Sequence, residues 1–250
     1  MIREYAEYPE LYGKCVLVTG GSRGIGRAIV EAFAANGCKV AFIYEKNDIA
    51  AESTEMESGA LAVKCDISDP EMASKAVEKA AEIMGGVDVI VNNAAISKIS
   101  LFNDMTDDEW AQMIGVNLSG AFYVTRAASR YMITKQSGRI INIGSMWGKT
   151  GASCEVAYSA TKAGMRGFTM SLAKELGPSG ITVNCIEPGV IDTEMNASLG
   201  EDAIDALVDE TPLCRIGDPA DVANAALFLA SNGASFITGQ TIGVDGGYAI

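Results

Sequence analysis

The sequence predicts an α/β protein: one doubly wound domain with a parallel seven-stranded sheet and helices on both faces. Three observations predict this fold. Short apolar runs rich in β-branched residues alternate with longer segments of helical period, as in successive β-α-β units. A glycine-rich turn separates the first apolar run from the first helical segment. No linker or repeat interrupts the 250 residues, of which 48% are apolar, so residues 1–250 are expected to form one domain.

The predicted elements alternate along the chain. Seven short apolar runs predict strands at residues 15–19, 39–44, 61–65, 87–92, 139–144, 181–186 and 241–244. Six segments with helical spacing, each opened or closed by Gly, Pro, Asp or Asn, predict helices at residues 24–36, 48–57, 70–84, 107–133, 158–176 and 219–231. One long insertion, residues 191–215, follows the sixth strand and has a helical pattern in its middle.

The charge balance and the absence of histidine exclude several classes of protein. The sequence has 19 basic and 32 acidic residues, and its net charge of -13 disfavours binding to nucleic acid or to an anionic membrane surface. With 0 histidines, Ser-His-Asp sites, Cys-His sites and the helix-borne zinc sites of proteases are excluded. Any proton transfer must therefore use Tyr, Lys, Asp, Glu or Cys.

The cysteines and the N-terminus indicate the compartment. The 6 cysteines form no C-x-x-C pair and lie mostly in apolar runs, so neither a disulfide framework nor a metal site is predicted. Residues 1–14 contain no apolar signal-peptide segment, and no run reaches membrane-spanning length. We therefore expect a soluble cytoplasmic protein without membrane or nucleic-acid partners.

The turn after the first predicted strand has the composition of a phosphate-binding loop. Its glycines permit a tight turn and a close approach of a pyrophosphate to the backbone, and the N-terminus of the next helix offers free N–H groups. Because a strand precedes the turn and a helix follows it, the turn predicts dinucleotide binding and a Rossmann fold. The residues expected to line this part of the site are Gly20, Ser22, Arg23, Gly24, Ile25 and Gly26.

Further candidate residues follow the other strands. Ligands of doubly wound sheets bind beyond the carboxyl ends of the strands, so these positions are expected to line one site. The carboxylate of Asp66 can meet an adenine edge or form a turn. The expected residues are Tyr44 at the second strand, Asp66 and Ile67 after the third, Asn93, Ala94 and Ala95 after the fourth, and Pro188, Gly189, Ile191 and Thr193 after the sixth.

Two Tyr-x-x-x-Lys pairs occur in the sequence, and their contexts differ. The i, i+4 spacing on a helix places Tyr158 and Lys162 on one face, where the ammonium can favour the tyrosinate. This pair follows Ser145, at the end of the fifth predicted strand, and lies in a run of Ala, Ser and Gly. Tyr131 and Lys135 precede that strand and are interpreted as a solvated helix end.

Together these motifs resemble the short-chain dehydrogenase/reductase (SDR) family, and the resemblance covers residues 14–247. Within the family the chain is similar to the bacterial group that contains the 3-oxoacyl-carrier-protein reductases. One departure is Ala95, where the family usually has Gly; the methyl group should perturb packing modestly if the backbone there does not need a positive φ. The motifs in the family's order are Thr19-Gly20-x-x-x-Gly24-x-Gly26, Asn92-Asn93-Ala94, Asn117, Ser145, Tyr158/Lys162 and Pro188-Gly189.

The resemblance implies reversible hydride transfer between a nicotinamide coenzyme and a carbonyl or secondary alcohol. Tyr158 is then expected to give a proton to the developing alkoxide in reduction and to take it back in oxidation. Lys162 is expected to lower the pKa of Tyr158 and to bind the nicotinamide ribose, and Ser145 to orient and polarise the substrate oxygen. Asn117 is expected to hold a water of a proton relay, or alternatively to relieve a helix kink.

The residues near the second strand favour NADP(H) over NAD(H). Arg23 is placed as in many NADP-using relatives, where it pairs with the 2′-phosphate, and Lys46 can assist. An NAD site usually has an acidic residue at the end of the second strand. That position is Tyr44 here, and the adjacent Glu45 keeps NAD(H) open as the alternative.

The substrate is less defined than the coenzyme. Relatives that dock an acidic acyl carrier normally have basic residues where this chain has Gln136 and Ser179, and the net charge of -13 repels such a carrier. A small-molecule carbonyl or alcohol is therefore ranked ahead of a 3-oxoacyl-carrier-protein substrate. A non-catalytic dinucleotide sensor is a third hypothesis, which the presence of both Tyr158 and Lys162 disfavours.

The insertion and two long helices carry the remaining expectations. Residues 191–215 are expected to cover the substrate, with apolar side chains that form either a pocket wall or ordinary lid packing. The helices at 107–133 and 158–176 resemble subunit-packing helices of the family and imply a homotetramer or homodimer. The apolar residues are Met146, Trp147, Cys154, Met195, Leu199, Ile204, Leu207 and Val208.

Overall fold

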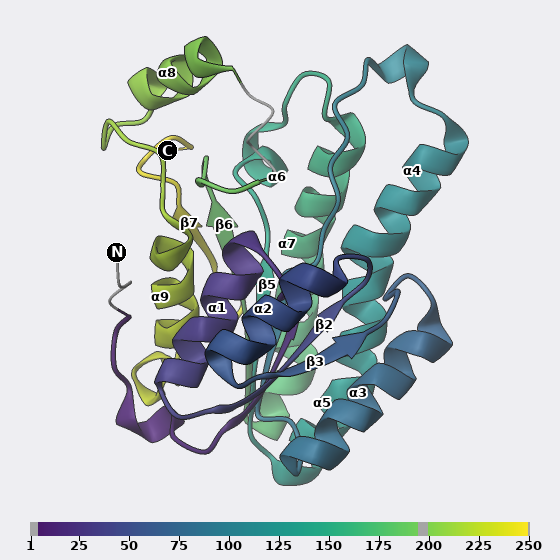
Figure 1. The fold of residues 1–250 in the computed structure, drawn as a ribbon, viewed down its shortest axis with the longest axis vertical. Coiled ribbons are helices and arrows are strands. Elements are labelled where there is room, and N and C mark those ends of the chain that lie inside the picture. The colour runs from purple at the N-terminus through teal and green to yellow at the C-terminus, as the bar shows by residue number, and fades with distance from the viewer. Residues whose placement is uncertain (1–4, 195–199, 250) are drawn as a thin grey trace.

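The computed structural model describes residues 5–194 and 200–249 and contains a seven-stranded parallel sheet (Figure 1). The strand order is β3-β2-β1-β4-β5-β6-β7, and every neighbouring pair is parallel. The predicted fold class is therefore confirmed. The strands are β1 (Cys15–Thr19), β2 (Lys39–Tyr44), β3 (Leu61–Lys64), β4 (Val89–Asn92), β5 (Gly138–Ile143), β6 (Ile181–Pro188) and β7 (Thr241–Val244).

The direction of winding reverses between β1 and β4. From β1 the chain moves outward through β2 to β3, and it then crosses back to β4 and continues in the other direction to β7. Loops that leave the two central strands therefore diverge and leave a crevice at the carboxyl edge of the sheet. The glycine-rich turn after β1 and the loop after β4 meet at this reversal.

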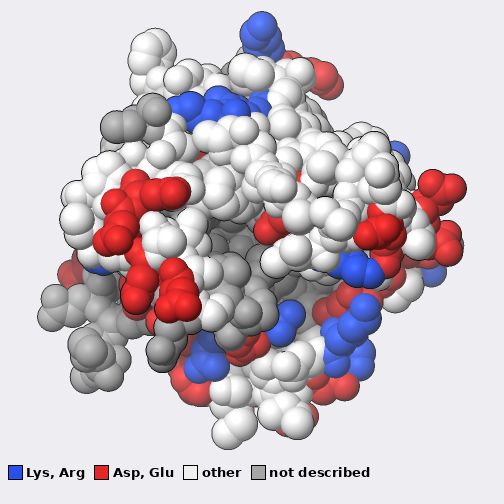
Figure 2. Space-filling view, turned by 90° about the horizontal axis from the view of Figure 1, so that it is seen from above, with Lys and Arg blue, Asp and Glu red and all other residues white. Residues whose placement is uncertain are grey.

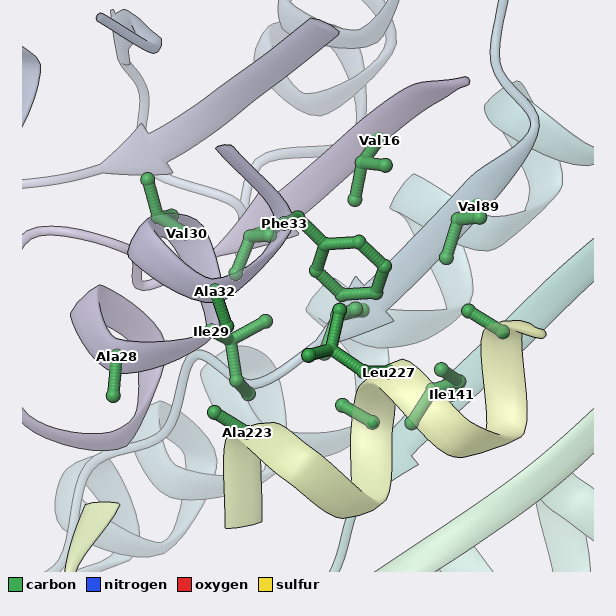
Figure 3. Packing of buried hydrophobic residues seen from close by; sticks show 14 of the residues in the cluster. Val16, Ala28, Ile29, Val30, Ala32, Phe33, Val89, Ile141, Ala223 and Leu227 are labelled. Carbon is green, nitrogen blue, oxygen red and sulfur yellow. The ribbon is translucent and has the colours of Figure 1, made fainter. Parts of the chain in front are cut away.

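Helices cover both faces of the sheet. Alternate residues of β1 point to opposite faces, so Val16 packs with one apolar cluster and Leu17 with the other. On the first face α1 and α9 pack together, with Phe33 and Leu227 fully buried between them and the sheet (Figure 3). On the second face residues of α3, α5 and α7 form the other cluster. The long helices are α1 (Gly24–Ala35), α2 (Asp48–Ser58), α3 (Pro70–Met84), α4 (Asp107–Ile114), α5 (Ala121–Lys135), α7 (Val156–Leu176) and α9 (Pro219–Ala230).

The predicted helix at 107–133 is not continuous. A capping box of Thr106 and Glu109 starts α4, and a π-helical segment, Gly115–Gly120, separates α4 from α5. Helical periodicity cannot distinguish such a segment, because its apolar spacing is nearly that of an α-helix. The prediction was therefore right about the helical path and wrong about its continuity.

Element ends differ from the predictions by a few residues. Strand β6 extends to Pro188 because its last residues pair with β7, in the register Pro188↔Val244. Helix α7 begins at Val156 rather than at position 158, and a short helix, α6 (Trp147–Thr150), precedes it. These ends depend on pairing and packing that the local pattern does not contain.

The insertion contains α8 (Glu201–Glu210), which lies at the top of Figure 1 above the carboxyl edge of the sheet. The predicted lid residues Met195 and Leu199 lie outside the described residues. Across the described part of the chain, every helix is too short or too polar to cross a membrane.

Candidate active site

A cavity of about 820 Å³ lies at the carboxyl edge, at the reversal between β1 and β4. Figure 2 looks down on this end of the molecule and shows its hollowed centre. Every residue predicted to contact the coenzyme lines the cavity, together with Ser145, Tyr158 and Lys162; the predicted catalytic residue Asn117 does not. These residues are Gly20, Ser22, Arg23, Gly24, Ile25, Gly26, Tyr44, Asp66, Ile67, Asn93, Ala94, Ala95, Pro188, Gly189, Ile191 and Thr193.

The glycine-rich turn has a conformation that side chains would prevent. Gly20 and Gly24 have φ of 67° and 54°, in the left-handed region. A Cβ on Gly26 would lie 2.0 Å from the carbonyl oxygen of Gly20 and 2.5 Å from Nδ2 of Asn93. The turn is held against the sheet because the backbone N–H of Gly20 donates to the Ile43 carbonyl at 2.7 Å.

The N-terminus of α1 opens into the cavity without a side-chain cap. The side chain of its N-cap residue, Arg23, forms no capping hydrogen bond, whereas the side chains of Asp69 and Asp218 cap α3 and α9. Uncapped N–H groups at a helix N-terminus suit a phosphate. The turn, the helix end and the size of the cavity therefore fit a dinucleotide.

The loop after β4 is tied to the glycine-rich turn. Nδ2 of Asn93 donates to the carbonyls of Thr19 and Gly20 at 2.9 and 3.1 Å. Oγ1 of Thr19 accepts from the backbone N–H groups of Asn93 and Ala94, each at 3.0 Å. Sequence reasoning gave Thr19 no role, because nothing local shows that its hydroxyl faces a loop 74 residues away.

Ala95 is not among the described non-glycine residues with positive φ, so the methyl group at this position is tolerated.

Ser145, Tyr158 and Lys162 meet at one end of the cavity. Ser145, just after β5, is 8% exposed and shares a hydrogen bond with Tyr158 on α7. Lys162 is 3% exposed; its Nζ donates to the carbonyl of Ile143 at 2.8 Å and lies 5.5 Å from the centroid of the Tyr158 ring. A proton donor, a hydroxyl and an ammonium thus converge on the same space.

Burial dominates the ionisation of this cluster. It raises the pKa of Tyr158 to about 12, the charge of Glu155 adds to this rise, and the hydrogen bond with Ser145 opposes it. Burial also lowers the pKa of Lys162 from its ordinary 10.5 to about 8. The sequence argument expected Lys162 to lower the pKa of Tyr158, whereas the shift in this structure is upward and follows from burial and from Glu155. At neutral pH Tyr158 therefore carries its proton and can donate it.

Asn117 lies behind the cavity, in the π-helical segment. Its Oδ1 accepts from the backbone N–H of Ile96 at 2.8 Å, and its Nδ2 donates to the Ile96 carbonyl at 2.9 Å. Nδ2 also donates to Oγ1 of Thr161 on α7 at 3.2 Å. The side chain thus joins the loop after β4 to α7 at Thr161, which lies between Tyr158 and Lys162.

The second Tyr-x-x-x-Lys pair lies at the amino edge of the sheet. Tyr131 and Lys135 are exposed on the last turns of α5, beside a separate cavity of about 550 Å³. Lys135 forms an ion pair with Asp88. Neither residue lines the larger cavity, in agreement with their interpretation as a solvated helix end.

At the far end of the cavity from Tyr158, the cations predicted for NADP(H) are paired with carboxylates. Arg23 pairs with Glu194 at 3.0 Å, and both side chains are well exposed. Lys46 pairs with Glu45 at 2.9 Å. Exposed pairs of this kind are weak, so an incoming phosphate can replace the carboxylates.

Two more predicted residues in this region make local bonds. The hydroxyl of Tyr44 donates to Asp48 at 3.1 Å. Asp66 accepts from the backbone N–H and the hydroxyl of Ser68 at 2.9 and 2.7 Å, which is the turn-forming role foreseen for it. Asp66 also lines the cavity, so it can contact a ligand while it forms this turn.

Comparison with known proteins identifies the family. A family model described as enoyl-(acyl carrier protein) reductase matches residues 20–249. The 3-oxoacyl-[acyl-carrier-protein] reductase FabG of Escherichia coli is 42% identical over 236 residues, which cover 94% of this chain and 97% of FabG. The chain belongs to the SDR family. This SDR is also 43% identical to the acetoacetyl-CoA reductase of Shinella zoogloeoides, over 94% of its own length and 98% of the relative.

Solved structures agree with this assignment. The 3-oxoacyl-[acyl-carrier protein] reductase of Brucella melitensis has a TM-score of 0.91 and 36% identity, and the match covers 100% of this SDR and 98% of that chain. A short-chain dehydrogenase of Burkholderia cenocepacia in complex with NADP has a TM-score of 0.90 and 36% identity, over 96% and 99% of the two chains. A blue fluorescent protein from a metagenomic library, in complex with NADPH, has a TM-score of 0.90 and 38% identity over the same shares.

Proposed function

We propose that this SDR is an NADP(H)-dependent oxidoreductase that interconverts a carbonyl and a secondary alcohol, with Tyr158 as the acid and base. The observation that carries the proposal is the convergence of Ser145, Tyr158 and Lys162 in a cavity that also contains the glycine-rich turn. The sensor hypothesis needs none of these three groups. Their common position in the cavity therefore favours an enzyme.

The protein's side chains have complementary roles in the reduction. When bound, NADPH supplies the hydride. Tyr158, protonated at neutral pH, donates its proton to the substrate oxygen as negative charge develops there. Ser145 donates a hydrogen bond to the same oxygen and orients it. Lys162 supplies a positive charge beside the Tyr158 ring, which stabilises the tyrosinate left after proton transfer.

We assign Asn117 a supporting part in this site. Its side chain fixes the Ile96 backbone on one side and Thr161, next to Lys162, on the other. The π-helical segment around it also breaks the regular backbone pairing of the helix, which suits a role in holding a relay water.

The coenzyme is best accounted for as NADP(H). Arg23 and Lys46 line the cavity near the end of β2, where the 2′-phosphate of NADP would lie in a Rossmann fold. Two structural relatives are complexes with NADP or NADPH. NAD(H) is the alternative, since Glu45 lines the same region and a carboxylate there suits a free ribose hydroxyl.

The substrate class favoured by the relatives is a 3-oxoacyl thioester. Both FabG and the acetoacetyl-CoA reductases carry such activities in their names. The apolar wall formed by Met146, Trp147 and Leu207 suits a short acyl chain. Gln136 and Ser179 are uncharged and the net charge is -13, so we favour a small thioester over one carried by an acidic protein.

An initial-rate assay tests the proposal. Purified protein is mixed with acetoacetyl-CoA, and the oxidation of NADPH and of NADH is followed separately. We expect turnover with NADPH that falls by about 100-fold or more in Tyr158→Phe, and stays within about twofold in the matched control Tyr131→Phe. Coenzyme binding should survive in both variants. Full turnover in Tyr158→Phe would refute the role of Tyr158, and a protein that binds NADPH but turns over no 3-oxo compound would refute the substrate class.

We also propose a homotetramer or homodimer that works in the cytoplasm. Phe122 on α5 and Met170 on α7 are 42% and 50% exposed, as expected of helices that pack against another subunit. The six cysteines lie within the described residues and all are free thiols, which suits a reducing compartment. Light scattering tests the assembly, and a monomer would contradict it.

A further inference from the structure

An acidic side chain lies in the part of the cavity where the substrate would bind. Glu155 is the residue before α7, three positions ahead of Tyr158, and it lines the cavity. Its charge contributes to the raised pKa of Tyr158, so the two groups are close enough to interact. Ser97, which bonds to Glu155, also lines the cavity, and the lining includes the apolar residues Ile96, Ile99, Val116, Met146 and Trp147.

Glu155 has few partners of its own. Its Oε2 accepts a hydrogen bond from the Ser97 hydroxyl at 3.0 Å. Although Glu155 is the N-cap residue of α7, its side chain does not cap the helix. Among the described residues no Lys or Arg forms an ion pair with it. Partial burial raises the pKa of this carboxyl, which is the direction expected of a carboxylate without a cation.

A carboxylate with one accepted hydrogen bond has acceptor capacity to spare, since its two oxygens offer about four lone-pair sites. A partly buried acceptor without a hydrogen bond raises the free energy of the site, so a ligand that supplies a donor binds more favourably. A second carboxylate at the same place would meet repulsion in a medium of low dielectric.

Helix α8, beside the cavity, has the same sign of charge as Glu155. Helix α8 contributes Leu207 to the lining, and it carries the exposed acidic residues Asp202, Asp205, Asp209 and Glu210. Figure 2 shows acidic side chains gathered beside the hollow. The charge of α8 therefore adds to the repulsion that Glu155 exerts on a carboxylate in this part of the cavity.

We propose that Glu155 is a specificity-determining residue: it accepts a hydrogen bond from an N–H or O–H group next to the reacting carbonyl, and it excludes substrates with a carboxylate there. The inference rests on the proposed function and deepens it. Among 3-oxo compounds it selects neutral amides and thioesters over the free 3-oxo acids, and an amide gains a hydrogen bond to Glu155 in addition. The competing explanation is that Glu155 only anchors the loop after β4 through Ser97.

Two variants separate these explanations. Glu155→Gln removes the charge but keeps the size of the side chain and an acceptor for Ser97. Ser97→Ala removes the hydrogen bond between the loop and Glu155 but keeps the charge. Three substrates of similar size complete the design: acetoacetate bears a carboxylate, acetoacetamide bears an N–H donor, and ethyl acetoacetate has neither.

The readout is the ratio of kcat/KM for acetoacetamide to that for acetoacetate with NADPH. We expect the wild-type ratio to fall by about tenfold or more in Glu155→Gln, mainly through faster use of acetoacetate, and to change less than about threefold in Ser97→Ala. Because the charge of Glu155 also raises the pKa of Tyr158, Glu155→Gln can change the turnover of all three substrates alike; ethyl acetoacetate measures this common effect, and the ratio cancels it. An equal change for all three substrates in Glu155→Gln, or loss of the preference in Ser97→Ala, overturns the proposal.

A binding measurement keeps this test independent of turnover. In the Tyr158→Phe background, with NADPH bound, the dissociation constants of acetoacetamide and acetoacetate are measured by coenzyme fluorescence, with and without Glu155→Gln. The amide should bind more tightly than the acid only when Glu155 is present. Equal binding of the two, or no binding of the amide, overturns the inference. Failure of the proposed function shows instead as absence of wild-type turnover.

Discussion

We predict that the buried ammonium of Lys162 destabilises the folded protein. Burial lowers the pKa of Lys162 from its ordinary 10.5 to about 8. Because the unfolded chain binds the proton more tightly, the unfolded state holds more protons between these two pH values, and stability rises with pH there. Below pH 8 the whole penalty is present, about 3 kcal/mol at about 1.4 kcal/mol for each pH unit.

Lys162→Met isolates this penalty. The variant removes the buried charge but leaves the Ile143 carbonyl without its donor, which costs about 1–2 kcal/mol. At pH 7 we therefore expect Lys162→Met to be inactive yet more stable than the wild type by about 1–2 kcal/mol, a rise of a few degrees in Tm. By pH 10 the penalty on the wild type shrinks by about 2 kcal/mol, so the advantage should disappear.

The assay is thermal unfolding of the coenzyme-free wild type and Lys162→Met at pH 7, 8, 9 and 10, at one protein concentration. Taking the difference between the two proteins cancels the titration of other thiols and phenols. A difference in stability that does not change with pH, or that grows in favour of the variant as pH rises, would refute the reasoning.

Three further substitutions test other parts of the structure. Gly26→Ala places a methyl group 2.0 Å from the Gly20 carbonyl, so NADPH affinity measured by fluorescence titration should fall by about tenfold or more; unchanged affinity would contradict the observed turn. Arg23→Glu should lower kcat/KM for NADPH by about tenfold or more and leave NADH within about threefold, and an equal loss with both coenzymes would remove Arg23 from phosphate recognition. Leu227→Ala empties a fully buried site between α9 and α1 and should cost about 2–5 kcal/mol in urea unfolding, whereas a cost below about 1 kcal/mol would mean that the two helices repack.

Much of the coenzyme site follows from local chemistry. Gly20, Gly24 and Gly26 are readable in the sequence because only glycine meets the backbone demands of the turn, and a strand and a helix flank them. The alternation of apolar runs fixes the seven strands for a similar reason, since a buried parallel strand leaves its mark within a few residues. Candidates chosen on these grounds line a single cavity because the carboxyl ends of parallel strands share one edge.

Other features depend on packing between distant segments. The π-helical segment at Asn117 is hidden within an ordinary helical pattern. The bond of Ser97 to Glu155 spans 58 residues, and the pair of Arg23 with Glu194 spans 171. No local pattern identifies such partners, because each depends on how loops from different strands are arranged above the sheet.

The Tyr158/Lys162 pair shows which properties of the site can be read from the sequence and which depend on the folded structure. The residue types, the i, i+4 spacing and the position after Ser145 can all be read from the sequence, and they establish which groups can exchange a proton. The ionisation of these groups depends on the folded protein, because the pKa of each group depends on how much water the surrounding elements remove. The spacing predicted a lowered pKa for Tyr158, whereas burial in the folded protein raises it to about 12 and lowers that of Lys162 to about 8.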